Sequence, residues 1–431
     1  MQTRPGDLRR DVRGDGACCT RELHHDEEGT GAVSIGLNRR RAESLVMELM
    51  AIEGPSCHEG RVAERIREHL LAAGAEPGWI SNDTAHKRTP APGEVGNLIM
   101  KVPGAGSLKR APRRMLSAHL DTVPVCVGSQ PKRKGDVVTS VGKRDGGPTG
   151  LGADNRAGCA VLLATALELL DQDLPRPPLT FCWFVQEEIG LQGARNVSLA
   201  KLGNPPLAFN WDGGGPAKLT IGATGGIRMR IDITGIASHA GGAPEQGVSA
   251  LAIAALAIAD LHRGGWHGDV HGAKGEHGTS NVGTLHGGVA TNVVADQATL
   301  LAECRSHDGK FRQRIAREME RAFKDAAKQV RNVAGQTGKV KIESRLDYDS
   351  FLLKPDEPCV LIAEEAVRRA GLDPVRAVAN GGLDANWITK HGIPTVSLGC
   401  GQRNQHMVTE QLVMSEFLSA CEIAFRIATE P

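Results

Sequence analysis

The chain has 431 residues, a length at which a single hydrophobic core has usually stopped growing, so we expect at least two domains. Lys and Arg total 51 and Asp and Glu total 50, a balance that gives no general attraction to nucleic acid or to an anionic membrane. The longest apolar runs, 161–170 and 251–259, fall short of the roughly 20 residues that cross a bilayer. We therefore predict neither a nucleic-acid partner nor a membrane segment.

The N-terminal residues 1–37 combine Arg, Asp, Glu and Gly with little hydrophobic periodicity and no apolar core. They fit neither a signal peptide nor a transit peptide, and we predict a disordered extension. Ten cysteines occur without a CxxC pair, and some lie in apolar stretches, such as Cys159 and Cys182. This distribution is typical of reduced, buried thiols in a cytoplasmic protein.

The next part of the chain, 38–221, alternates helical and strand patterns. Two amphipathic helices are predicted from Arg40 onward, the second stopped by Gly74. Apolar runs at 97–102 and 114–118 predict strands, Asp154 opens a further helix, and the runs LTFCWFV and PLAFNW predict two more buried strands. This alternation indicates an α/β fold, with a central mixed sheet flanked by helices.

A different order follows at 222–349, where the patterns spell β-α-β-β-α-β, the ferredoxin-like layout of a compact α+β domain. After it, 350–431 predicts a helix, a buried strand in IPTVSLG and a terminal helix from Glu410 to Ile427. We therefore expect the second domain to be inserted into the first.

Four histidines occur close together in the predicted insertion, within LHRGGWHGDVHGAKGEHG. They are His262, His267, His271 and His277. A separate metal site is one interpretation. We favour an exposed Gly-rich loop, because nothing in the sequence fixes a coordination geometry there.

Imidazole and carboxylate side chains follow the ends of the predicted strands or begin the next element. They are His119 in SAHLDTVP, Asp154 in LGADNRAG, Glu187 and Glu188 in VQEEIG, Asp212 in FNWDGGG and His406 in GQRNQH. Open α/β sheets bind ligands at the carboxyl ends of their strands. Five such ligands and one spare acid are the inventory of a two-metal hydrolytic site. Taken singly, each motif is more often a turn or a surface feature than a metal site.

The segments SAHLDTVP, LGADNRAG, VQEEIGLQGA, FNWDGGG, GIASHAGGAPEQG, GGLDAN and IPTVSLGCGQRNQH resemble the motifs of a dinuclear zinc peptidase family. This family contains peptidase T, carboxypeptidase G, acetylornithine deacetylase and aminoacylase, and the similarity extends from about residue 38 to the end. It implies a catalytic domain formed by 38–221 and 350–431, with 222–349 as a lid and dimerisation domain. A homodimer through the lid is therefore expected.

The resemblance implies two zinc ions, for which cobalt or manganese could substitute. His119 and Asp212 would bind one ion, Glu188 and His406 the other, and Asp154 would bridge them. Asp121 would orient His119, and Glu187 would be the general base. The resemblance also implies a cis peptide bond between Asp154 and Asn155.

Four further residues match substrate-binding positions of the family. His239 would stabilise the oxyanion, unless it is an ordinary loop histidine. Asn292, Arg305 and Gly382 would contact the substrate, although a surface salt bridge would explain Arg305 nearly as well.

The residue type at position 212 gives information about the substrate class. Deacylases and carboxypeptidases of the family usually carry Glu at this position, whereas this chain carries Asp. The shorter acid favours a peptidase T-like aminopeptidase or tripeptidase that acts on short peptides. An N-acyl amino acid amidohydrolase, or a carboxypeptidase, is the alternative. A non-catalytic metal-binding homologue is a second alternative.

Overall fold

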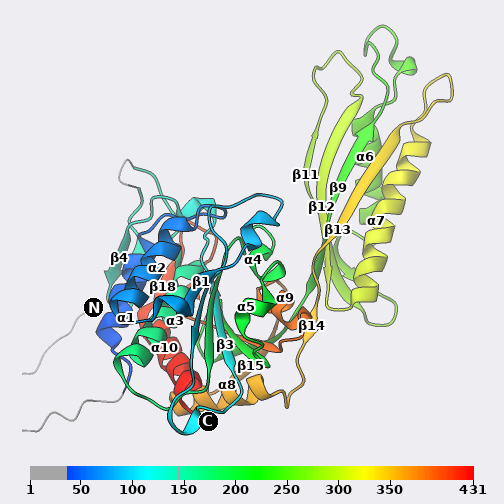
Figure 1. Cartoon of the computed structure of the whole chain (residues 1–431). Coiled ribbons are helices and arrows are strands. Elements are labelled where there is room, and N and C mark those ends of the chain that lie inside the picture. Colours follow the sequence, from blue (N-terminus) through cyan, green and yellow to red (C-terminus); the bar gives the residue numbers. More distant parts are fainter. Residues whose placement is uncertain (1–35, 144–145) are drawn as a thin grey trace, which may run out of the picture. The chain divides into compact units, whose positions relative to one another are not determined.

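A computed structural model describes residues 36–143 and 146–431, so the predicted extension lies outside the described residues except for its last two positions (Figure 1). The largest of three sheets has nine strands in the order β1-β2-β6-β3-β7-β16-β8-β14, and β15 pairs with β8. Its strands are β1 (Ile80–Asn82), β2 (Leu98–Val102), β3 (Arg114–His119), β6 (Leu179–Phe184), β7 (Leu207–Trp211), β8 (Lys218–Ala223), β14 (Phe351–Leu352), β15 (Val375–Ala379) and β16 (Thr395–Leu398).

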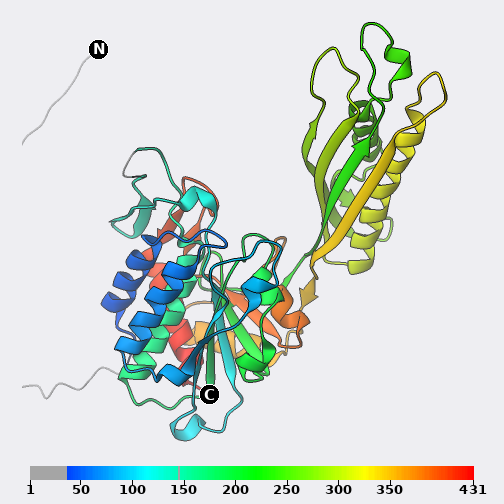
Figure 2. The ribbon, with the colours of Figure 1, turned by 45° about the horizontal axis from the view of Figure 1, so that its top comes forward.

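Helices cover both faces of this sheet (Figures 1 and 2). One face packs against α1 (Arg39–Met50), α2 (Gly60–Ala72), α3 (Ala153–Asp171), α8 (Pro358–Arg369) and α10 (Met414–Thr429). The other face packs against α4 (Gln192–Arg195), α5 (Leu199–Leu202) and α9 (Ala385–Lys390). A mixed α/β sheet flanked by helices is the architecture predicted for this part of the chain.

The five-stranded sheet is antiparallel throughout, in the order β10-β11-β12-β9-β13, and α6 (Ala250–Arg263) and α7 (Gly309–Gln329) pack on one of its faces. Its strands are β9 (Gly225–Thr234), β10 (Gly268–His271), β11 (His277–Gly287), β12 (Gln297–Ser306) and β13 (Lys339–Tyr348). Four of them and the two helices follow the predicted β-α-β-β-α-β order. We predicted a loop for the histidine-rich segment 262–277. This prediction is wrong for 268–271, because these residues form β10, which pairs with the beginning of β11.

A four-stranded sheet, in the order β17-β18-β5-β4, completes the fold. Its strands are β4 (Pro131–Lys134), β5 (Val137–Ser140), β17 (Gln402–Arg403) and β18 (Gln411–Val413). The predicted start of the last helix at Glu410 is wrong: 411–413 are a strand, and α10 begins at Met414. The hydrogen bonds of β18 to β5 outweigh the helical apolar pattern here.

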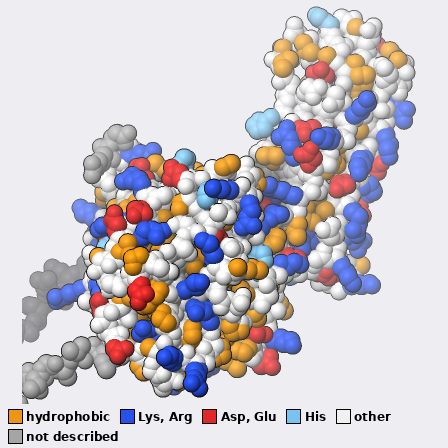
Figure 3. Space-filling model, in the orientation of Figure 1, with side chains coloured by type: hydrophobic (Ala, Val, Ile, Leu, Met, Phe, Trp, Pro, Cys, Tyr) orange, Lys and Arg blue, Asp and Glu red, His pale blue; other side chains and the backbone are white. Residues whose placement is uncertain are grey.

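Acidic and basic side chains are interspersed on the face drawn in Figure 3, in agreement with their nearly equal totals. Among the described residues, no helix has both the length and the apolar character needed to span a membrane. The eight cysteines in this part of the chain are free, and seven of them are buried.

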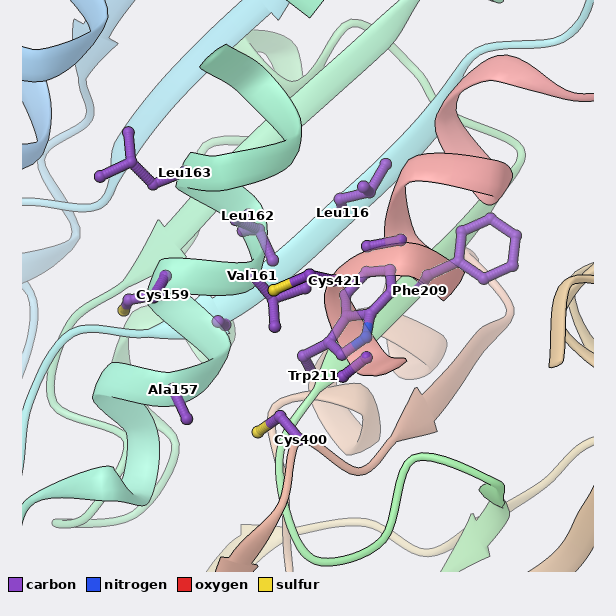
Figure 4. Packing of buried hydrophobic residues seen from close by; sticks show 14 of the residues in the cluster. Leu116, Ala157, Cys159, Val161, Leu162, Leu163, Phe209, Trp211, Cys400 and Cys421 are labelled. Carbon is purple, nitrogen blue, oxygen red and sulfur yellow. The ribbon is translucent and has the colours of Figure 1, made fainter. Parts of the chain in front are cut away.

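The main core lies between the nine-stranded sheet and the helices on one of its faces. Figure 4 shows Leu116 of β3, Trp211 of β7, Val161 of α3 and Cys421 of α10 in this cluster. Since both faces of the sheet are covered, its central strands β3 and β6 are buried along their whole length. This packing fixes the strand ends from which the candidate site is built.

Candidate metal centre

The strands β6, β3 and β7 are parallel neighbours, so their carboxyl ends meet at one edge of the sheet. His119 is the last residue of β3, Glu187 and Glu188 follow β6, and Asp212 follows β7. The sheet therefore brings together four residues that are spread over 94 positions of the sequence (212 − 119 + 1).

The loop that carries Asp154 is held by buried hydrogen bonds at the start of α3. Glu410 accepts from the backbone N–H groups of Gly152 (2.7 Å) and Asp154 (2.9 Å). Gln402 donates from Nε2 to the carbonyl oxygen of Ala153 and to Oδ1 of Asn155, both at 3.0 Å. The peptide bond between Asp154 and Asn155 is cis, as predicted.

The carboxylate of Asp154 lies between two imidazoles. Its Oδ1 is 3.2 Å from Nε2 of His119, and its Oδ2 is 3.4 Å from Nε2 of His406. The same nitrogen of His406 is 2.9 Å from Oε2 of Glu188. Ligand atoms of His119, Asp154 and Glu188 lie within 4.8 Å of one another, and so do those of His119, Glu187 and Asp212. All six predicted residues are thus in one cluster.

Asp121 connects His119 with the Glu pair. Its two carboxylate oxygens accept from the backbone N–H groups of Glu187 (2.9 Å) and Glu188 (3.1 Å), and Ser56 Oγ donates to it at 2.6 Å. Nδ1 of His119 lies 3.1 Å from the carbonyl oxygen and 3.4 Å from Oδ1 of Asp121. Either acceptor favours a proton on Nδ1 of His119, so Nε2, which faces Oδ1 of Asp154, is the nitrogen that would coordinate a metal ion.

The cluster contains more buried carboxylates than cations. Burial raises the pKa of Glu187 well above its usual range, and burial and the charge of Asp154 raise the pKa of Asp212 to about 7. Burial lowers the pKa of His119, but the surrounding carboxylates outweigh it and leave that pKa well above its ordinary value. Hydrogen bonds to Asp154 and Glu188 raise the pKa of His406 to about 10.

Three buried acids near the site were not among the predicted residues. Asp384 begins the turn into α9, and both of its carboxylate oxygens are buried without a hydrogen-bond partner. Burial, and then the charge of Asp212, raise its pKa well above the usual range, although His119 opposes the shift. Glu59 accepts from the backbone N–H groups of Cys57 and Gln186, and Glu410 holds the Asp154 loop.

The sequence signal for these acids is weak. Asp384 lies in GGLDAN, a motif from which only Gly382 was predicted to have a role, and nothing local indicates burial for Glu59 or Glu410. Such residues are recognised only when the fold shows what surrounds them.

Within 36–143 and 146–431, none of the four predicted substrate residues forms a hydrogen bond or an ion pair with the cluster. His239 is exposed, and its Nδ1 accepts from the backbone N–H groups of Gly241 (3.1 Å) and Gly242 (2.8 Å), so the proton of its neutral ring is on Nε2. The carbonyl oxygen of Asn292 accepts from Ala240, which brings the two loops together.

Arg305 and Gly382 lie in different surroundings. The guanidinium of Arg305 forms a bidentate ion pair with the carboxylate of Glu303, with N–O distances of 2.9 and 3.1 Å. This agrees with the salt-bridge alternative. Gly382 lies against the ring of Tyr348, where a Cβ atom would be 2.7 Å from the ring carbon Cζ.

The donor set fits divalent cations. Two imidazoles and several carboxylates are the ligands of zinc, cobalt and manganese sites, and Oδ1 of Asp154 is buried without a hydrogen bond. Divalent ions would compensate the excess of buried negative charge, which side chains of the cluster leave uncompensated.

Comparisons with known proteins agree with this geometry. Residues 221–331 match the model of the peptidase dimerisation domain, and 97–233 match that of peptidase family M28. The uncharacterized protein YqjE of Bacillus subtilis is 28% identical over 91% of this chain and 99% of its own.

Two solved structures are similar along nearly their whole length. A tripeptidase from Staphylococcus aureus is 29% identical with a TM-score of 0.80, and the aminopeptidase PepT from Bacillus cereus is 28% identical with a TM-score of 0.76. Each alignment covers 91% of this chain and 98% of the other. These similarities support a dinuclear zinc peptidase family of the M20/M28 type for this chain, and they indicate a metallopeptidase hydrolase.

Proposed function

We propose that this metallopeptidase releases N-terminal amino acids from short peptides and uses two zinc ions, with cobalt or manganese as substitutes. The observation that carries the proposal is the position of Asp154, with one carboxylate oxygen toward His119 and the other toward His406. We assign His119 and Asp212 to one ion, Glu188 and His406 to the other, and Asp154 to both.

Bound divalent ions supply Lewis acidity, which polarises the scissile carbonyl and lowers the pKa of a water molecule. Glu187 is the general base: it takes a proton from the attacking water and returns it to the leaving amine nitrogen. Its buried position and its raised pKa support this role, because a raised pKa makes a carboxylate a stronger base toward the proton of water.

His239 is assigned to the oxyanion. Because its Nδ1 accepts two backbone N–H groups, its Nε2 carries a proton that it can donate to the developing negative charge. Asn292, beside the His239 loop, Arg305 and Gly382 remain assigned to the substrate. For Arg305 this requires that its ion pair with Glu303 opens.

The preference for short peptides with a free amino group rests on the acid Asp212 and on similarity to a tripeptidase and an aminopeptidase. The test is hydrolysis of free tripeptides, N-acetylated tripeptides and N-acetyl amino acids by the zinc-loaded enzyme. We expect rapid release of the first residue from free tripeptides only. Exclusive activity on the acetylated substrates would instead establish an amidohydrolase, and release from the C-terminus a carboxypeptidase.

We also propose that 222–349 is the lid and dimerisation domain, inserted between 38–221 and 350–431. Two exposed apolar side chains support a homodimer: Leu256 on α6, which is 40% exposed, and Leu285 on β11, which is 41% exposed. Moreover, β10 pairs only with 277–280 of β11, so within the described chain the edge of β11 beyond residue 280 is open to a second copy. The free cysteines support a cytoplasmic location.

A further inference from the structure

A second group of metal-ligating side chains lies on the hairpin of β10 and β11, in the five-stranded sheet. Asp269 and His271 are two residues apart on β10, so they lie on the same face of the strand. His277, the first residue of β11, is the direct cross-strand partner of His271 and shares that face. Register therefore brings two imidazoles and one carboxylate together.

The three side chains converge on one point. Nε2 of His271 is 2.9 Å from Oδ2 of Asp269, and Nε2 of His277 is 2.6 Å from Oδ1 of the same carboxylate. The two rings are 5.2 Å apart between centroids, and one ligand atom from each residue lies within 4.8 Å of the other two. Both imidazoles thus present the same nitrogen to the same acid.

The opposite face of the hairpin is anchored in the core. Val270 is 1% exposed and packs in the buried cluster beneath the sheet. A Cβ atom on Gly278 would lie 2.7 Å from Cδ1 of Ile315 on α7, so β11 is packed closely on that helix. Ser306 Oγ also donates to the carbonyl oxygen of His277 at 2.6 Å. The ligands are therefore mounted on backbone that the core holds in place.

We propose that Asp269, His271 and His277 bind one divalent transition metal ion, with zinc as the best match, at a site separate from the candidate dinuclear centre. Two imidazole nitrogens and one carboxylate oxygen are a zinc donor set that leaves a fourth position for water. Ligands of a tetrahedral zinc ion are roughly 3.4 Å apart at bond lengths of about 2.1 Å. Small side-chain rotations would open the present cluster to that spacing.

The competing account is that the two imidazoles simply pair with the acid. All three side chains are more than half exposed, and exposed ion pairs contribute little to stability. A metal ion would instead join the two strands of the hairpin, at the edge of the sheet where β10 has one neighbouring strand. The two accounts therefore differ in whether zinc changes the hairpin.

The first measurement is zinc bound per full-length chain, by equilibrium dialysis against zinc chloride and elemental analysis. The variants are Asp269→Asn, His271→Gln and His277→Gln, and His286→Gln on the same strand is the matched control. We expect each of the three variants to bind one zinc fewer than the wild type, or to bind it at least about tenfold more weakly, because loss of a direct ligand should cost no less than loss of a supporting one. The control should match the wild type, and tripeptide hydrolysis should be unchanged in all four.

The second measurement locates the ion. Hydrogen exchange of the peptide 266–282 should slow on addition of zinc in the wild type and in His119→Ala, and should not change in Asp269→Asn. Because His119→Ala impairs the dinuclear centre alone, this pair separates the two sites. Equal zinc content in all variants, or exchange of 266–282 that zinc does not alter in the wild type, would overturn the proposal.

Discussion

Nε2 of His406 lies 2.9 Å from Oε2 of Glu188, although the two residues are 218 positions apart and the whole five-stranded sheet lies between them in the sequence. The same nitrogen lies 3.4 Å from Oδ2 of Asp154. The last part of the chain thus completes a site that the first part begins. We therefore expect metal binding to require both segments.

Glu187→Gln should retain both metal ions and lose turnover. The amide keeps the size of the side chain but cannot accept the proton of water, so kcat should fall by a factor of about 10² to 10⁴. The measurement is kcat on a tripeptide together with metal content. Glu94→Gln, an exposed acid paired with His58, is the control and should leave kcat unchanged. Near-normal kcat in Glu187→Gln would contradict the assignment of the base.

Glu410→Gln should weaken metal binding, although Glu410 is not itself a proposed metal ligand. Glu410 uses both oxygens to accept from Gly152 and Asp154, and an amide would turn an N–H group toward one of these donors. The Asp154 loop would shift, and we expect metal affinity to fall about 10- to 100-fold. Competition with a chromogenic chelator measures the affinity. Glu422→Gln on α10 is the control, and equal affinities in the two variants would argue against a positioning role.

Removal of the metal ions should lower the melting temperature of the protein. The cluster leaves several carboxylates buried close together, and ions that bind only the folded state stabilise it by about 4 kcal/mol at a thousandfold excess over Kd. Differential scanning calorimetry before and after dialysis against a chelator measures the effect, and added zinc should restore the transition. A melting temperature that does not depend on zinc would show that the buried carboxylates of the cluster do not need bound metal ions for the protein to be stable.

Glu59→Gln should change how the stability of the metal-free protein depends on pH. Burial and the charge of Asp121 raise the pKa of Glu59 from 4.5 to about 7, so the folded state holds this proton more tightly than the unfolded state. The stabilisation is complete below pH 4.5 and is lost as the pH rises through 7. The variant should therefore gain stability over the wild type between pH 5 and pH 8, by on the order of 2 kcal/mol.

Urea unfolding of both metal-free proteins at the two pH values measures this difference. The amide oxygen of Gln can still accept from the N–H groups of Cys57 and Gln186, which keeps the packing matched. If the stability difference between variant and wild type is the same at pH 5 and pH 8, Glu59 does not titrate in this range.

Leu256→Glu should dissociate the expected homodimer. A charge on the exposed part of α6 would have to be buried in a dimer interface without a partner. Light scattering after size-exclusion chromatography measures the mass. Leu361→Glu on α8, a leucine that is 48% exposed, is the matched control and should leave the mass unchanged.

Much of the fold could be predicted from local patterns. The apolar runs that become β3, β6 and β7 are buried on both faces, and amphipathic periodicity marks α1, α2 and α7. The proximity of His119, Glu188 and Asp212 could be predicted because residues that end parallel strands share an edge of the sheet. Their proposed roles as metal ligands came from the family resemblance.

The environment of several side chains depends on tertiary structure and has no signal in the local sequence pattern. Burial of Glu59, Asp384 and Glu410 depends on segments remote in sequence, so their unusual environments have no local signal. The same reason applies to the hairpin of β10 and β11. The sequence determined that histidines cluster there, but only the cross-strand register of His271 with His277, and the burial of Val270 beneath them, created a fixed geometry. A pattern specifies which faces are apolar, whereas packing specifies which side chains meet.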